Sequence, residues 1–417
     1  MTQNNCNFDF TIIGGSFAGM TSALALSNVS PDLKIAIIEK QDILKEDKKR
    51  DGRAYAISSA SLKLFKEIGI FDELQTEAGI ISDIKITDYK SPFFLDFLKR
   101  ETGGDLGQII ENYHIHNALR NQILQRKNIS VFAPNFYQEI EFTNEASNKC
   151  RATVKTAHSQ QPVNPNLLRG SYDVTVKLDD QRIINSKLLL ACDGRFSKLR
   201  EIYQIHTTVK KYGQTAIVFN VEHALPHQNI AHEKFLPGGP LAILPLKDPN
   251  HSSIVWIAPD QLAQAILALN EKNFAQQLMK KMEDCQGDEF GEIKVISEKF
   301  SYPLIAIEAE KFFHEKMLLI GDASCGLHPI AGQGFNLAVT GINILCELVK
   351  NSDQNLIETY NKKTKSEARK MLVATDILNS LFETKSLSIS LLRDFGLGLV
   401  NKLPRLKKFF IKSAGGF

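Results

Sequence analysis

The sequence predicts an α/β fold in which a Rossmann-like domain carries an inserted, mostly antiparallel β-sheet domain and a helical C-terminus. Three patterns predict it: a strand–glycine turn–helix–strand unit at the N-terminus, strand-like alternation across residues 211–300, and helical periodicity from about residue 340 onward. The chain has 417 residues, whereas a typical domain has roughly 100 to 200. We therefore expect two or three domains, each with a substantial core.

The composition is that of a folded protein with little net charge. Hydrophobic residues make up 43% of the chain, and 50 Lys and Arg face 47 Asp and Glu, which leaves a formal charge of +3. This composition excludes extensive disorder and gives no support to a nucleic-acid partner, which would need a strong basic field. No two of the six cysteines form a CxxC pair, so no zinc or redox motif is predicted.

The N-terminus and the hydropathy pattern predict a cytoplasmic protein. The first residues have neither the basic start nor the apolar stretch of a secretory signal. No window approaches the roughly 18 consecutive apolar residues that a membrane-spanning helix needs. Any membrane contact is therefore expected to be peripheral, on the inner face of the membrane.

The order of elements indicates a Rossmann-like domain assembled from separated segments. The first βαβ unit consists of a strand at 8–13, a helix at 20–26 and a strand at 34–39. The later predicted elements are a strand near 81–87, a helix near 114–126, strands at 187–191 and 317–320, and one helix near 261–284. A strand pattern over 152–178 is interrupted at 156–171 by polar residues and prolines, which is typical of a surface insertion.

These elements divide the chain into three predicted regions. The discontinuous dinucleotide-binding domain comprises residues 1–80, 105–204 and 300–360. The inserted substrate domain comprises residues 81–104 and 205–299. Residues 361–417 form a helical C-terminal region that ends in a basic amphipathic tail.

A dinucleotide-binding fingerprint follows the first strand. Such a turn needs glycine for its tight bend, for the close approach of the pyrophosphate and for packing of the helix on the strand. Gly14 and Gly19 occupy the first and third positions, whereas Ser16 stands at the second, beside the flexible Gly15. Glu39, at the end of the next strand, can accept hydrogen bonds from both ribose hydroxyls of an adenosine. A plain turn with an exposed glutamate would give the same pattern, so this motif alone leaves that alternative open.

Two later strands also end in an acid and a glycine. Asp193 and Gly194 follow one of them, and Gly321 and Asp322 follow the other. Asp322 is placed to hydrogen-bond a polyol such as a ribityl chain. The glycines within 332–334 allow backbone amides to face a ligand at a helix N-terminus, where the helix dipole favours negative charge.

Several sequence blocks occur in a family's order along nearly the whole chain. They are DGRAYAIS at 51–58, LGQIIEN at 106–112, YGQTA at 212–216, AHEKFLPGGPLAILPL at 231–246 and HPIAGQGFN at 328–336. With these blocks the chain resembles the group A flavoprotein aromatic hydroxylases. More narrowly, it resembles the ubiquinone-biosynthesis hydroxylase family, which has a para-hydroxybenzoate-hydroxylase-like fold.

The resemblance implies that the cofactor is FAD, with NAD(P)H as the electron donor. The implied contacts to the ADP half of FAD and its turn are Gly14, Gly15, Ser16, Gly19 and Glu39. Arg53 is implied to reach the flavin, and Asp193 and Gly194 match the family's dual FAD and NAD(P)H motif. The implied ribose and ribityl contacts are Gly321 and Asp322, and the implied isoalloxazine loop contains Gly332, Gln333, Gly334 and Asn336.

The chain also departs from the family pattern at several positions. The family usually has an Ala-His pair where this chain has Ser324 and Cys325, and it has glycine and an acid where this chain has Ala338 and Gly341. Together with Ser16 in the fingerprint, these changes leave FAD binding expected but put the detailed geometry of the active site in question. A small buried thiol is the expected state of Cys325.

The resemblance implies a monooxygenase that hydroxylates the ring of a polyprenylated phenol in ubiquinone biosynthesis. In this family NAD(P)H reduces FAD, oxygen adds to give a flavin C4a-hydroperoxide, and an electron-rich phenol attacks its terminal oxygen. Two alternatives stay open. One is a related flavin hydroxylase of a soluble aromatic compound, and the other is a catalytically silent scaffold of a ubiquinone-biosynthesis complex.

The candidate substrate pocket comes from the inserted sheet and the signature loop. Its candidate residues are Tyr212, Gln214, His232, Phe235, Pro245, Leu246, His328 and Pro329. Those from the sheet could equally be core residues. His328 is an acid–base candidate, but the adjacent Pro329 favours a backbone-shaping role, so no catalytic residue is assigned.

A metal site is not predicted. His223, His227 and His232 lie close in sequence, but Pro226 breaks the helix that would bring the first two onto one face.

The C-terminal residues 391–417 form a basic, amphipathic stretch. They carry six basic residues and one acid, a net charge of +5, whereas the rest of the chain carries −2. Interleaved Leu, Val, Ile and Phe would let this stretch lie on an anionic membrane surface. A helix packed on a second copy of the chain, or on another ubiquinone-biosynthesis protein, would give the same pattern, and both interpretations stay open.

Overall fold

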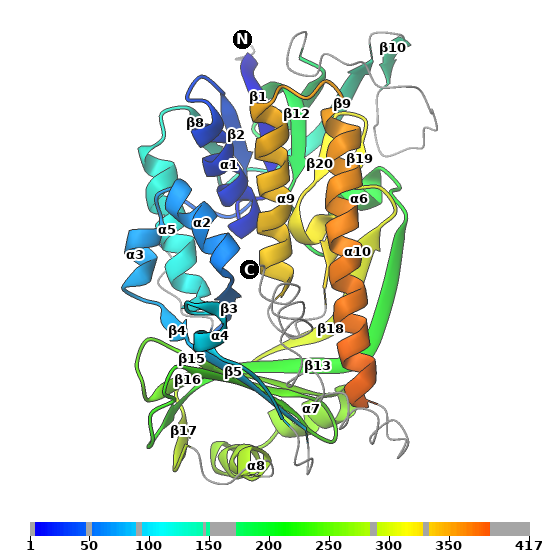
Figure 1. Ribbon diagram of the computed structural model, residues 1–417. Coiled ribbons are helices and arrows are strands. Elements are labelled where there is room, and N and C mark those ends of the chain that lie inside the picture. The colour runs from blue at the N-terminus through cyan, green and yellow to red at the C-terminus, as the bar shows by residue number, and fades with distance from the viewer. Residues whose placement is uncertain are drawn as a thin grey trace.

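The structure is a computed structural model that describes residues 5–46, 52–88, 94–144, 147–150, 172–283, 290–327 and 333–383. Two large β-sheets lie at opposite ends of the molecule, and most of the helices surround the first sheet (Figure 1). This arrangement confirms the predicted α/β fold class.

The first sheet has nine strands, in the order β10-β9-β11-β12-β1-β2-β8, with β20 beside β12 and β19 beside β20. They are β1 (Asn5–Ile13), β2 (Ile35–Ile38), β8 (Ile129–Phe132), β9 (Tyr137–Asn144), β10 (Ser147–Cys150), β11 (Val174–Leu178), β12 (Ile183–Ala191), β19 (Phe313–His314) and β20 (Met317–Leu319). Strands β8, β2, β1, β12 and β20 run parallel. Every side chain of β2 is buried, as expected for a parallel strand covered on both faces. The carboxyl ends of the parallel strands therefore meet at one edge of the sheet.

Helices cover this sheet. They are α1 (Phe17–Val29), α2 (Ser59–Glu67), α3 (Phe71–Gln75), α5 (Asn112–Gln125), α6 (Lys198–Ile202), α9 (Gln333–Lys350) and α10 (Leu356–Glu383), with a 3₁₀ turn η1 (Gly321–Ala323). The short helix α4 (Lys99–Thr102) lies toward the other large sheet instead (Figure 1). Helix α9 packs against both α1 and α10. The C-terminal helical region was predicted to begin at residue 361, but α10 begins earlier, at Leu356.

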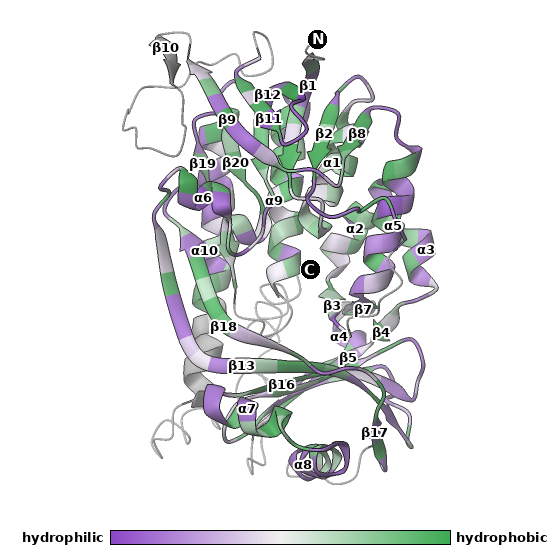
Figure 2. Ribbon diagram, turned by 180° about the vertical axis from the view of Figure 1, so that it is seen from behind, coloured by the Kyte–Doolittle hydropathy of each residue, from purple (hydrophilic) through white to green (hydrophobic). Residues whose placement is uncertain are grey.

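The second sheet also has nine strands, in the order β21-β18-β13-β16-β15-β14-β5-β6, with β17 beside β13. They are β5 (Asp83–Asp88), β6 (Phe94–Phe97), β13 (Thr207–His223), β14 (Ile230–Phe235), β15 (Leu241–Pro245), β16 (His251–Pro259), β17 (Ile293–Val295), β18 (Phe300–Ala309) and β21 (Cys325–Gly326). All its pairs are antiparallel except β14 with β5. Helices α7 (Asp260–Leu267) and α8 (Glu271–Glu283) cover the face that points away from the first sheet (Figure 2).

Two sequence expectations differ from this sheet. The single helix near 261–284 is two helices, because the side chain of Asn270 accepts a hydrogen bond from the backbone N–H of Asn273 (2.9 Å) and starts a new helix there. The proposed boundary at residue 300 falls at the start of β18, which pairs with β13 and so belongs to the second sheet.

A small sheet of β3 (Ala54–Ile57), β7 (Gly107–Glu111) and β4 (Gly79–Ile81) joins the two large ones. Its strand β3 packs on α9, and its strand β4 packs on β15. The predicted insertion at 156–171 and the basic tail at 391–417 lie outside the described residues. Among the helices that the structure describes, none is long and apolar enough to cross a membrane.

Candidate active site

The glycine turn after β1 has the close packing that a dinucleotide fingerprint requires. Gly14 has a φ of +104°, and a side chain there would collide with the carbonyl of Cys192 at the end of β12. A Cβ on Gly19 would collide with the carbonyl oxygen of Gly14. The turn and the first turn of α1 therefore accept only glycine at these two positions.

Helix α1 presents its N-terminus at this turn without capping itself. Its N-cap, Ser16, makes no side-chain capping hydrogen bond, and the first turn contains no acid. The Glu39 carboxylate accepts hydrogen bonds from the backbone N–H of Gly15 (2.6 Å) and of Gln41 (2.9 Å). An uncapped N-terminus of a 13-residue helix beside a carboxylate fits a pyrophosphate and an adenosine ribose.

Asp193 lies directly after β12, at the same edge of the sheet. Its Oδ2 accepts a hydrogen bond from the backbone N–H of Leu199 (3.2 Å), and this fixes the turn into α6. Its Oδ1 is buried and has no hydrogen-bond partner among the residues that the structure describes. A buried oxygen of this kind is costly unless a ligand or water satisfies it.

Asp322 lies in η1, close to the start of α9. Its Oδ2 is 3.3 Å from a terminal nitrogen of Arg195, a pairing that the sequence reasoning did not identify although Arg195 directly follows Gly194. Its Oδ1 lies 4.0 Å from the position that a Cβ on Gly334 would occupy. The predicted ribityl contact and the predicted flavin loop are therefore neighbours in space.

Gly321 shows how closely the helices approach here. It has a φ of +61°, and a Cβ at this position would lie 3.3 Å from the Cβ of Ala18 in α1 and 3.4 Å from that of Ala338 in α9. The structure accommodates Ala338 at the position where the family usually has glycine. Its methyl group leaves little space for a side chain at position 321.

Asn336 is engaged with the protein itself. Its Oδ1 accepts from the backbone N–H of Ser58 (3.1 Å) and from Oγ of Ser61 (2.8 Å), while its Nδ2 donates to the carbonyl of Ala56 (3.0 Å). The amide therefore ties α9 to the turn between β3 and α2. This ties down the backbone after Arg53, which immediately precedes β3.

An aromatic cluster that the sequence reasoning missed surrounds the start of α9. The Phe335 ring centroid lies 3.8 Å from that of Phe17, 5.0 Å from that of Tyr55 and 5.9 Å from that of Phe65. These residues are scattered along the sequence, so no local pattern could have linked them. The cluster joins the fingerprint helix to the strand after Arg53.

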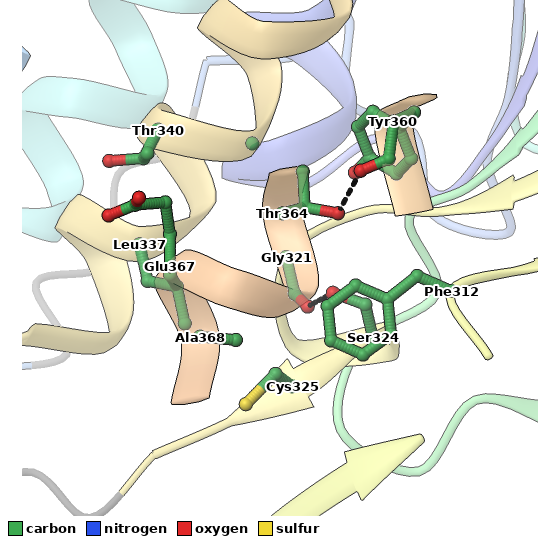
Figure 3. A pocket seen from close by; sticks show the side chains of 11 residues that line it. Phe312, Gly321, Ser324, Cys325, Leu337, Thr340, Tyr360, Thr364, Glu367 and Ala368 are labelled. Atoms are coloured by element: carbon green, nitrogen blue, oxygen red, sulfur yellow. Dashed lines mark hydrogen bonds between the residues drawn. The ribbon is translucent and has the colours of Figure 1, made fainter. Parts of the chain in front are cut away.

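Three of the departures from the family pattern line one small cavity. Ser324, directly after η1, and Cys325 of β21 meet Gly341 of α9 there, together with Tyr360 and Thr364 of α10 (Figure 3). A Cβ on Gly341 would lie 3.4 Å from the Tyr360 hydroxyl, which donates to the carbonyl of Leu319 (3.1 Å). Burial raises the pKa of the Cys325 thiol to about 12, so the thiol stays protonated at neutral pH. Tyr360 therefore packs against the position where the family usually has an acid.

The candidate pocket residues do not share one face of the second sheet. His232 was a pocket candidate, but its ring lies 5.4 Å from that of Phe290, on the face covered by α7 and α8. His232 therefore lies on the face opposite to the one that turns toward the first sheet, because alternate residues of a strand point to opposite faces. Phe235 lies three residues further along β14, so its side chain points to the opposite face from His232, where it is buried.

The remaining candidates divide between a core and the sheet edge. Leu246 belongs to the apolar cluster around Ile109, and both Pro245 and Leu246 contact Gly79 of β4. Tyr212 packs against a separate apolar group that contains Ala216. Gln214 is partly buried at the end of the β13–β16 pairing. Of the predicted loop residues, His328, Pro329 and Gly332 lie outside the described residues, and Gln333 is the first residue of α9.

The two histidines that suggested a metal are bonded to the protein. Nδ1 and Nε2 of His223 lie 2.7 Å from the carbonyl oxygen of Leu225 and 2.9 Å from Oγ of Ser252. Nε2 of His227 lies 3.0 Å from the carbonyl oxygen of Leu246. Burial lowers the pKa of both rings, so both are neutral at pH 7.

The fold and this edge of the first sheet together define a dinucleotide-binding flavoprotein. The FAD-binding domain family matches residues 7–375. The chain belongs to this family, and within it to the FAD-dependent aromatic hydroxylases that include the ubiquinone hydroxylases. A ubiquinone hydroxylase, UbiL, from Rhodospirillum rubrum is 31% identical over 98% of this chain and 89% of its own length. The ubiquinone hydroxylase UbiM from Neisseria meningitidis is 26% identical over 98% of this chain and 84% of its own length.

Solved structures share the fold at low sequence identity. The p-nitrophenol 4-monooxygenase PnpA from Pseudomonas putida superposes with a TM-score of 0.74 at 12% identity, covering 98% of this chain and 99% of its own. The anhydrotetracycline hydroxylase OxyS from Streptomyces rimosus has a TM-score of 0.67 at 15% identity, covering 98% of this chain and 76% of its own. These likenesses confirm the fold.

Proposed function

We propose that this FAD-dependent hydroxylase adds oxygen to the aromatic ring of a polyprenylated phenol in ubiquinone biosynthesis, with NAD(P)H as the electron donor. The observation that carries the proposal is the 31% identity, over 98% of the chain, with a ubiquinone hydroxylase. The alternatives, hydroxylation of a soluble aromatic compound or a silent scaffold, lack an observation of this kind. The first sheet would hold FAD, and the second sheet, including β18, would hold the substrate.

The residues at the carboxyl edge of the first sheet would hold the cofactor. Gly14, Gly15 and Gly19 would admit the pyrophosphate beside the N-terminus of α1, and Glu39 would bind the adenosine ribose. Asp322, near the start of α9, would bind the ribityl chain. Bound FAD would supply the oxygen-activating chemistry.

The chain itself would orient the two reactants and exclude water. The backbone amides at the start of α9 would stabilise negative charge on the flavin, since they lie at the positive end of an 18-residue helix. The apolar side chains of the second sheet would keep the reacting atoms dry. Asn336, through its bonds to Ser58 and Ala56, would hold Arg53 and α9 in a fixed relation.

The first test is the visible absorption spectrum of the purified protein after incubation with FAD and desalting. We expect about one FAD per chain in the wild type and a several-fold weaker retention in Asp322→Ala. Glu222→Gln, a change at an exposed position of the second sheet, is the matched control and should retain FAD fully. A colourless wild type that cannot be reloaded would favour the scaffold.

The second test compares substrates. The holoenzyme should hydroxylate a prenylated phenol with a kcat/KM at least tenfold above that for the same phenol without its prenyl chain, because the chain adds apolar burial. Equal activity on both would favour the soluble-substrate alternative.

We also propose that the protein is cytoplasmic and contacts the inner face of the membrane through residues 391–417. Six basic residues among apolar ones support this contact, at about 1 kcal/mol per basic residue near anionic lipid. In sedimentation with anionic liposomes, deletion of 391–417 should abolish binding. Unchanged binding after the deletion would argue against this contact, and a changed oligomeric state would favour self-association.

A further inference from the structure

One carboxylate stands in an otherwise apolar row of the second sheet. Register pairs place Glu233 of β14 between Ile86 of β5 and Ala242 of β15. The row continues through Val255 of β16 and Val218 of β13. We call these five residues the Glu233 row, and Glu233 is its one ionisable member.

The neighbours of the row show which way it points, since residues two apart on a strand share a face. Asn220, two residues after Val218, donates from Nδ2 to Oε1 of Glu111 on β7 (3.2 Å). Ala231, two residues before Glu233, belongs to one apolar cluster with Ala54 and Ala56 of β3. The Glu233 row therefore faces the small sheet and, beyond it, the proposed cofactor site.

The end of the row lies beside a proposed flavin contact. Val218 is paired with Phe300 of β18. The Phe300 ring lies 3.6 Å from the position that a Cβ on Gly52 would occupy, and Gly52 immediately precedes Arg53. The face that carries Glu233 thus continues to the turn from which Arg53 would reach the flavin.

The surroundings of Glu233 are those of a functional carboxylate. Its side chain is partly exposed, yet within the described ranges it makes no hydrogen bond or ion pair. Burial raises its pKa from 4.5 to about 7. The nearest lysines along the strands, Lys85 and Lys234, have the parity of the opposite face, where Lys234 Nζ donates to the carbonyl of Met282 (2.9 Å). An unpaired carboxylate in apolar surroundings lowers stability, and such groups cluster at functional sites.

We propose that Glu233 is a catalytic residue that accepts the proton of the substrate's phenol hydroxyl while the ring lies on the apolar side chains of the Glu233 row. This inference rests on the proposed function, because it takes the substrate to be a phenol. The new C–O bond would form with one oxygen atom of O2, which bound FAD activates with electrons from NAD(P)H; the O–O bond breaks, and the second oxygen atom leaves as water. In the same step the proton of the phenol passes to a Glu233 oxygen, and the electron pair of the broken O–H bond is donated to the ring. When the ring then loses its C–H proton to water, Glu233 returns its proton to the same oxygen and ends unchanged.

The first experiment measures binding without turnover. The probe is para-nitrophenol, whose ionised form alone is yellow, added to the holoenzyme at a pH where the free probe is ionised. The wild type should take the probe up in its protonated form, with loss of the yellow absorbance, because two negative oxygens in contact share one proton. Glu233→Gln should bind the yellow, ionised form instead. Glu222→Gln, the exposed control, should behave as the wild type.

The second experiment measures the reaction with a prenylated phenol. Glu233→Gln should lower kcat by at least about 100-fold, the lower end of the range for a lost general base, with KM changed less than about threefold and FAD content unchanged. Its NAD(P)H consumption should yield hydrogen peroxide in place of hydroxylated phenol.

The outcomes separate the two proposals. An identical probe spectrum in the wild type and Glu233→Gln, or a wild-type hydroxylation rate in that variant, would overturn the role of Glu233 and leave the proposed function standing. A probe spectrum that depends on Glu233, in a wild type that hydroxylates no prenylated phenol, would overturn the proposed function instead and support the contact with a phenol.

Discussion

The two faces of the second sheet are built from the same strands but differ in what covers them. Beside the Glu233 row runs a row of the opposite parity, His232, Ile243, Ile254 and Phe219, which we call the His232 row. Its exposed fractions are 5%, 1%, 0% and 0%, because α7 and α8 cover it. In the Glu233 row, Ile86, Glu233 and Val255 are partly exposed, whereas Ala242 and Val218 are buried.

The two faces of the second sheet therefore contribute differently to the stability of the protein. The His232 row packs with Phe274, Leu278 and Met282 into a closed apolar core, and this core stabilises the sheet. In the Glu233 row, Ile86 and Val255 keep part of their apolar surface exposed, on the face that turns toward the small sheet. One face therefore provides stability, and the other is the face on which we propose that the aromatic ring lies.

The largest expected effect comes from opening the closed face. Phe219→Ala should lower the free energy of unfolding by about 3–5 kcal/mol, since its fully buried ring, 5.0 Å from that of Phe274, would leave a cavity. Val218→Ala, the neighbour on the Glu233 row, should cost only about 1–2 kcal/mol. Urea unfolding of both variants checks this, and equal losses would mean that the two faces are equally closed.

A smaller effect, of opposite sign, is expected at Glu233. Between pH 4.5 and about 7 the folded protein binds this proton more tightly than the unfolded chain, so wild-type stability falls as the pH rises through this range. Glu233→Gln should therefore raise the free energy of unfolding at about pH 8 by up to about 3 kcal/mol. The gain should vanish below pH 4.5. Urea titrations at both pH values test it, and a gain that does not vary with pH would point to packing instead.

The smallest effect is expected from filling the open face. Val255→Trp should weaken binding of a prenylated phenol about tenfold, or about 1.4 kcal/mol, while changing the free energy of unfolding by less than about 1 kcal/mol. Ile254→Trp, one residue earlier on the closed face, should instead destabilise the fold by about 1–3 kcal/mol through overpacking. Substrate titration and urea unfolding of both variants test this. Lower stability in Val255→Trp together with weaker binding in Ile254→Trp would contradict the comparison.

The cofactor half of the molecule was largely predictable from sequence because its constraints are local. Gly14 and Gly19 are required by contacts with Cys192 and with Gly14 itself, within a turn whose spacing is visible in the chain. The pairing of Arg195 with Asp322 was not visible, because it joins residues 127 positions apart.

The second sheet was harder to predict because burial does not alternate along β14. Its residues Ala231, His232, Lys234 and Phe235 are all buried, so no alternation of polar and apolar residues reveals which face is open. The sequence reasoning therefore selected His232 and Phe235 and passed over Glu233 between them. Only the register with β5 and β15, which comes from tertiary structure, assigns the face.

The packing of Tyr360 against Gly341 has a practical consequence for shortening the chain. The Tyr360 hydroxyl donates to the carbonyl of Leu319, two residues before Gly321, so α10 supports the strand end that leads to Asp322. A truncation that removes α10 along with the amphipathic tail would take this support from the cofactor site. Versions of the protein made for crystallisation or for assays in detergent-free buffer should therefore keep the chain through Glu383, the last residue of α10.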